Sequence, residues 1–224
     1  MSDKNEPVPQ ESPTEPQPAL PAPGTSSDKP VQQGFANAAE AKAAMDALLK
    51  ERWEKKKEGL APHEAAHAVV ADDMGYTVID VNIGRGKDQK ATIDWKGLEQ
   101  QLPQVNWKDS AAVAAIKPKV LDLVTCYVAG HLADAEGGHS DEKRISDRTT
   151  PELLNAGRRG RADLNATCYF LKLIGCNTQE EVLAAETRAR EILARRAGQH
   201  KALSEKLREN EFVEGKALQT LLGH

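Results

Sequence analysis

The sequence is poor in cysteine, in aromatic side chains and in long apolar runs. Its three cysteines, Cys126, Cys168 and Cys176, are too few and too widely spaced for a disulfide framework or a cysteine zinc knuckle. No apolar run approaches the roughly 18 residues that span a bilayer, so we expect no membrane partner. The first ten residues, "MSDKNEPVPQ", lack the apolar core of a signal peptide, which favours a cytoplasmic location. A formal net charge of -4 argues against a nucleic-acid partner.

The composition of the chain predicts an N-terminal tail followed by one globular domain. Residues 1–35 are rich in Pro, Glu, Ser and Gln and nearly lack large apolar side chains, so they cannot bury enough surface to offset the entropy of ordering. We therefore expect a disordered tail over 1–35. With 39% hydrophobic and 29% charged residues, the chain can build a core over 36–224.

Sequence patterns predict a mainly α-helical, α+β domain with a small β-hairpin. A helix-forming run covers Asn37 to about Gly59, and a second helix is expected over about Pro62 to Met74, because proline suits a first helical turn. After Gly75, the stretch "YTVIDVNIG" alternates Thr77, Ile79, Val81 and Ile83 with other side chains, which is typical of a strand. "KATIDW" follows a turn, and we expect it to be the hairpin's second strand and an edge of the sheet.

The second half of the chain is predicted to be helical. The expected helices cover 120–136, 161–175 and about 178–208, and a short helical tail is expected in "EFVEGKALQTLL".

One motif in the second predicted helix contains candidate metal ligands and a candidate general base. In "APHEAAHAVV", His63 and His67 are four residues apart, so both imidazoles project from one helix face and can bind one metal ion. Glu64 lies beside them, where a carboxylate can act as general base on a zinc-activated water. A pair of histidines on a solvated helix is the alternative. The small apolar residues around the motif favour the zinc site, because an unpaired ionisable group would be costly in a packed helix.

The motif and its surroundings resemble the peptidase domain of the FtsH-type zinc metalloproteases. "HEAAHAVV" is similar to the HEAGHA signature of that family, with Ala66 in the position of its glycine. Four later stretches resemble family segments in the same order. These stretches are "YTVIDVNIGRG", "YVAGHLADAE", "RADLNAT" and "LRENEFVEGKALQTLL".

The resemblance implies a zincin-like metallopeptidase fold and a third zinc ligand. The family's ligand aspartate matches Asp163 in "RADL". From the residues alone, Asp163 could equally be a helix cap. Asp134 matches an acidic family position and could orient a ligating imidazole or be a surface carboxylate. His131 or His139 could replace Asp163 as the ligand.

Three functions remain open at this level. We expect a soluble, ATP-independent zinc endopeptidase that cuts unfolded or extended polypeptides, because the family's GxxxxGK[ST] ATPase motif is missing. The alternative is a catalytically silent zinc-binding module that docks on a partner ATP-dependent protease. A zinc hydrolase of small molecules is the third, and a deep apolar pocket beside His63 would favour it. A homo-oligomer is possible in each case.

Overall fold

The computed structural model describes residues 38–86, 88–136, 161–176 and 178–224. The tail predicted over 1–35 and the candidate ligand His139 lie outside these residues. From Ala43 to His224 the described chain forms one compact unit. None of the described helices is long and apolar enough to cross a membrane.

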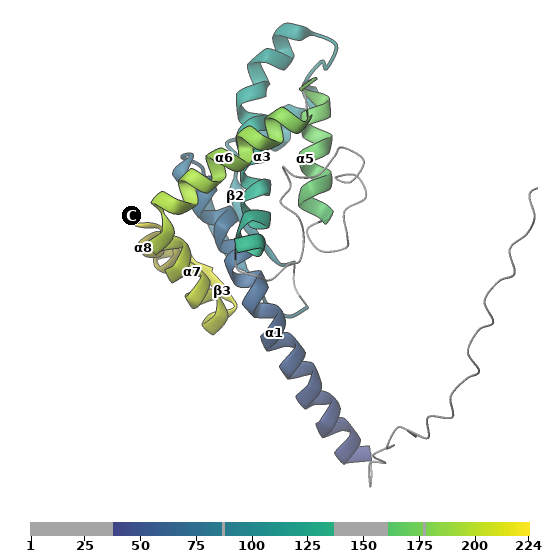
Figure 1. Cartoon of the computed structure of the whole chain (residues 1–224), viewed down its shortest axis with the longest axis vertical. Coiled ribbons are helices and arrows are strands. Elements are labelled where there is room, and N and C mark those ends of the chain that lie inside the picture. Colours follow the sequence, from purple (N-terminus) through teal and green to yellow (C-terminus); the bar gives the residue numbers. More distant parts are fainter. Residues whose placement is uncertain (1–37, 87, 137–160, 177) are drawn as a thin grey trace, which may run out of the picture. The chain divides into compact units, whose positions relative to one another are not determined.

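The described chain is mainly helical with a small antiparallel sheet (Figure 1). Its elements are α1 (Ala38–Asp73), β1 (Thr77–Asn82), β2 (Lys90–Asp94), α2 (Leu98–Gln101), η1 (Leu102–Gln104), α3 (Ser110–Glu136), α5 (Arg161–Leu173), α6 (Thr178–Arg195), α7 (Ala197–Asn210), β3 (Phe212–Glu214) and α8 (Gly215–Leu222).

Helix α1 is continuous, so the prediction of two separate helices was wrong. Pro62 lies inside α1 and removes one backbone hydrogen bond there. The helix continues because strong helix formers flank the proline, and because most residues from Ala61 to Ala71 are buried in the core. The predicted end is confirmed, since Gly75 follows the helix with a φ of 81°.

The predicted hairpin is confirmed, and β2 is an edge strand as expected. The sheet has the order β2-β1-β3, and β1 is antiparallel to both neighbours. The predicted alternation in β1 is inverted over 77–79, where Val78 is buried and Thr77 and Ile79 are exposed, because the register shifts between Val78 and Asp80. This bulge turns Ile79 outward with 52% of its surface exposed, while Val78 and Val81 are buried.

Two predictions about the C-terminal part were wrong. The helix expected over 178–208 is two helices, α6 and α7, separated at Arg196. The guanidinium of Arg196 donates to Asp72 and to the carbonyl of Leu222, so the break is fixed by contacts with distant residues. The expected helical tail begins as strand β3, which pairs with β1 before α8 starts.

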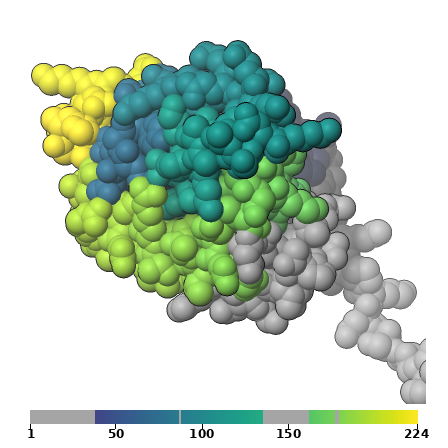
Figure 2. Space-filling model, turned by 90° about the horizontal axis from the view of Figure 1, so that it is seen from above, coloured from purple at the N-terminus to yellow at the C-terminus, as the bar shows by residue number. Residues whose placement is uncertain are grey.

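The core lies where α3 packs against α5 and α6 and where the second half of α1 is enclosed. The teal surface of α3 and the green surface of α5 and α6 meet in Figure 2. In α1, Ala65, Ala66, Val69 and Val70 expose no surface. The helix with the two histidines is therefore a buried structural element, as its small apolar residues indicate.

Candidate metal centre

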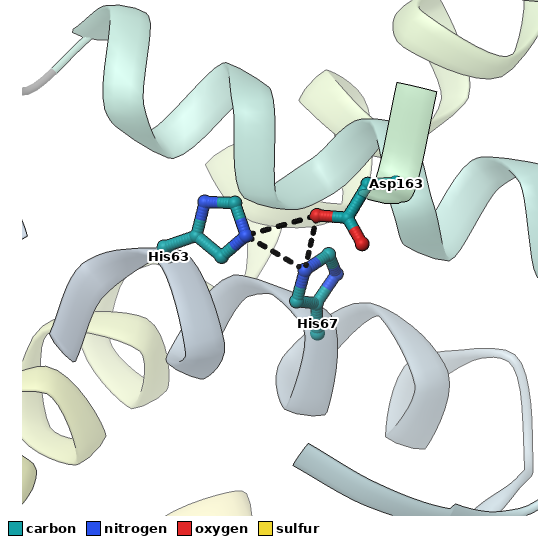
Figure 3. A group of neighbouring side chains, drawn as sticks. All are labelled: His63, His67 and Asp163. Atoms are coloured by element: carbon teal, nitrogen blue, oxygen red, sulfur yellow. Dashed lines mark hydrogen bonds and ion pairs between the residues drawn. The ribbon is translucent and has the colours of Figure 1, made fainter. Parts of the chain in front are cut away.

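Two helices bring three metal-binding side chains to one point. His63 and His67 lie one turn apart on α1, and Asp163 reaches them from the first turn of α5 (Figure 3). The Nε2 atoms of the two histidines are 3.1 Å apart, and Asp163 Oδ2 is 3.1 Å from His63 Nε2. The distance from Asp163 Oδ2 to His67 Nε2 is 3.4 Å. These three residues form a group that could hold a metal ion.

The spacing of the three donor atoms suits a small tetrahedral ion. Bonds of about 2.0–2.1 Å in tetrahedral geometry place two ligand atoms about 3.3–3.4 Å apart. The three measured separations are within a few tenths of an ångström of that value. Burial adds to the fit, since the side chains of His63, His67 and Asp163 expose only 12%, 9% and 18% of their surfaces.

The outer nitrogens of both imidazoles are fixed by hydrogen bonds. His67 Nδ1 lies 2.7 Å from the carbonyl oxygen of Cys126, which can only accept, so this nitrogen donates. His63 Nδ1 lies 2.9 Å from Asp134 Oδ2 and donates to that carboxylate. In neutral imidazoles both Nε2 atoms then carry lone pairs, and these meet the Asp163 oxygen. Three electron-rich atoms at such distances need either bound protons or a metal ion among them.

The pKa values of the metal-free protein follow from the same contacts. Burial lowers the pKa of His63, but hydrogen bonds to Asp134 and Asp163 outweigh burial and raise it to about 9. Burial and the bond to Asp163 oppose each other at His67 in the same way, and its pKa is raised well above the usual value. Burial also raises the pKa of Asp163, yet the two histidines hold it far below its ordinary range. Without a metal, protons therefore occupy the site.

Helix α3 approaches the histidines so closely that only glycine fits at Gly130. A Cβ atom there would lie 2.6 Å from His67 Nε2 and 2.7 Å from His63 Nε2. Neither contact is possible without movement of the rings or the helix. Gly130 was not among the predicted site residues, although a glycine within the helix-forming stretch "YVAGHLADAE" signals a close approach.

Glu64 lies beside the cluster and faces the edge strand. Its side chain is buried, and its Oε2 accepts a hydrogen bond of 3.0 Å from the backbone N–H of Ala91 on β2. Burial raises the pKa of Glu64, and the neighbouring histidines oppose this effect without cancelling it. The carboxylate therefore takes up a proton more readily than an exposed glutamate.

A cavity of about 270 Å³ joins these groups to the edge strand. Glu64, His67 and Asp163 line one part of it, and the successive residues 89–93 of β2 and its preceding turn line another. Trp95 and Tyr127 also contribute to its wall. The hollow thus follows a strand rather than forming an apolar pocket beside His63.

The predicted site residues come together. His131, the alternative third ligand that lies within the described residues, does not join them. His63, Glu64, His67 and Asp163 lie around one point, and Asp134 contacts His63 as a residue that orients the imidazole must. The ring of His131 has its centroid 6.1 Å from that of His63 and is not part of the three-residue group. The Cys126 carbonyl and the Ala91 N–H were not predicted, because backbone groups leave no trace in residue identity.

Two comparisons with known proteins were made for this chain. A scan against models of known protein families and a search of curated proteins both gave no match. The likeness to FtsH-type peptidases thus depends on the motifs quoted above.

Proposed function

We propose that this chain is a zinc endopeptidase that hydrolyses unfolded or extended polypeptides without ATP. The proposal includes a zincin-like fold of the kind found in FtsH-type peptidase domains. One observation carries it: a two-histidine, one-carboxylate cluster, a buried glutamate and an open sheet edge border the same cavity.

The donor set favours zinc at this cluster. Two imidazoles and one carboxylate are typical ligands of catalytic zinc, and three protein ligands leave a further position open. A bound zinc ion supplies a Lewis acid that activates water and polarises a carbonyl group. His63, His67 and Asp163 would hold the ion, and Asp134 and the Cys126 carbonyl would keep the two imidazoles in the tautomer that binds metal.

Glu64 is the general base in this proposal. Its carboxylate accepts a proton from the attacking water and later delivers it to the leaving amine nitrogen. Its position one residue after His63 keeps it near the ion without ligating it.

The edge strand β2 is the proposed binding site for substrate. An extended polypeptide can pair with its backbone, which supplies affinity without demanding a particular sequence. The cavity follows residues 89–93, and this favours a polypeptide over a compact small molecule. A substrate of this kind must be unfolded or locally extended, because a folded segment has no free backbone to offer.

The test is cleavage of an unfolded model protein by the zinc-loaded chain without ATP, beside Glu64→Gln as the matched variant. We expect the wild type to cut, and Glu64→Gln to retain zinc while its rate falls by about 10²-fold or more. If neither protein cuts although both hold zinc, the proposal fails. That result would favour the catalytically silent module that docks on a partner protease.

A further inference from the structure

The edge strand β2 contacts the proposed base directly. The Ala91 N–H donates to Glu64 Oε2 over 3.0 Å, across 27 residues of sequence. We infer that the backbone N–H of Ala91 is a positioning group, which fixes the Glu64 carboxylate for proton transfer. The catalytic part of this inference rests on the proposed function, whereas the hydrogen bond itself can be tested without any activity.

The direction of the Ala91 N–H follows from the pairing of the strands. Ala91 is opposite Val81, and its neighbours Lys90 and Thr92 are opposite Asn82 and Asp80. In an antiparallel ladder, the N–H and C=O of successive residues point alternately toward and away from the partner strand. Since Ala91 donates to Glu64, it points away from β1, and Lys90 and Thr92 point toward it.

A buried glutamate needs such a partner to keep one orientation. Its side chain has three rotatable bonds, and proton transfer requires the reacting oxygen within about 3 Å of the water. The bond to Ala91 fixes Oε2 and thereby leaves the transfer to Oε1. A main-chain donor in a sheet is more rigid than a side chain, so the carboxylate is held before substrate arrives.

The same alternation sets how a polypeptide can pair with β2. Ala91 and Ile93 both direct their backbone groups outward, but the Ala91 N–H is already used by Glu64. A bound polypeptide therefore pairs with the Ala91 carbonyl and with the Ile93 N–H. One short strand thus holds the base and binds the substrate, which places the two next to each other.

Amide hydrogen exchange measured by NMR tests the bond in the full chain. Outward N–H groups of an edge strand exchange quickly unless they have a partner. We expect Glu64→Ala to speed exchange at Ala91 by at least about tenfold relative to Thr92, whose N–H points to β1. Glu64→Gln keeps an acceptor oxygen and should preserve the protection. Equal exchange at Ala91 in the wild type and in Glu64→Ala would overturn the inference.

Kinetics of Ala91→Pro test the positioning role. Proline removes this N–H without removing a ladder bond, and proline is tolerated at outward positions of edge strands. We expect kcat to fall on the order of ten- to a hundredfold with KM within about twofold, because a charge-assisted hydrogen bond is lost. Zinc affinity should stay unchanged, because the three metal-binding side chains belong to other residues.

The outcomes separate the two proposals. A wild-type chain that cuts no polypeptide refutes the peptidase, while the exchange experiment still decides whether Ala91 holds Glu64. A folded, zinc-loaded Ala91→Pro variant with the wild-type kcat refutes the positioning role and leaves the peptidase intact. If Ala91→Pro does not fold, the exchange comparison between the wild type and Glu64→Ala decides.

Discussion

Replacing Gly130 with alanine should damage the metal centre while leaving the fold largely intact. The added methyl group would lie 2.6 Å from His67 Nε2, whereas ordinary van der Waals contact begins near 3.4 Å. The methyl carbon and the ring nitrogen must therefore move apart by about 0.8 Å. The imidazole rings cannot easily move by this distance, because their Nδ1 atoms are hydrogen-bonded to the Cys126 carbonyl and to Asp134. Zinc ligands tolerate displacements of only about 0.2 Å.

We therefore expect Gly130→Ala to weaken zinc binding by about 100-fold or more, measured by competition with a chromophoric chelator. Alanine itself favours a helix by up to about 1 kcal/mol, which offsets part of the strain in the metal-free protein. Gly198→Ala on α7 is the matched control, since a Cβ there meets nothing within 4 Å. Wild-type zinc affinity in Gly130→Ala would refute the close approach of α3 to the two histidines.

The remaining predictions concern protons, the partner of His63 and the break between α6 and α7. Because the pKa of His63 is near 9 without metal and zinc needs a neutral imidazole, zinc binding at pH 7 should release at least one proton. Apparent zinc affinity should then rise about tenfold per pH unit for each proton released, up to about pH 9. Titration calorimetry in two buffers measures the proton release, and a binding reaction that releases no proton would contradict the assignment. Asp134→Ala should weaken zinc binding by about 10- to 100-fold in the chelator assay, and an unchanged affinity would show that Asp134 does not orient His63. Arg196→Ala should lower the free energy of unfolding in urea by about 2 kcal/mol, because the largely buried Asp72 loses a charge-assisted hydrogen bond and keeps its contact with His224. Arg195→Ala, which removes an exposed ion pair, should cost less than about 1 kcal/mol, and equal losses would contradict this account.

The sequence predicts most of the metal centre because its chemistry is encoded locally. His63 and His67 have the spacing of one helical turn, so any helix brings their imidazoles together. Asp163 is 100 residues away from His63, and spacing alone could not distinguish a ligand from a helix cap. The resemblance to FtsH-type peptidases supplied that residue, and the structure brings its carboxylate to the two imidazoles.

The errors in the fold come from contacts between distant parts of the chain. Gly198 is the one poor helix former near Arg196, and it lies inside α7, so the local sequence does not mark the break, which is fixed by Asp72 and the Leu222 carbonyl. Phe212–Glu214 is too short to show a strand pattern, and it becomes a strand only because β1 offers an unpaired edge. At Pro62 the local rule favoured a helix start, but burial of the residues that follow kept α1 continuous.

X-ray absorption at the zinc edge, on the chain loaded with one equivalent of zinc, tests the central claim most directly. We predict two imidazole nitrogens and a carboxylate oxygen at about 2.0–2.1 Å, with the carboxylate contribution lost in Asp163→Ala. A spectrum with sulfur ligands, or one that is identical in the wild type and Asp163→Ala, would contradict a metal centre made of His63, His67 and Asp163.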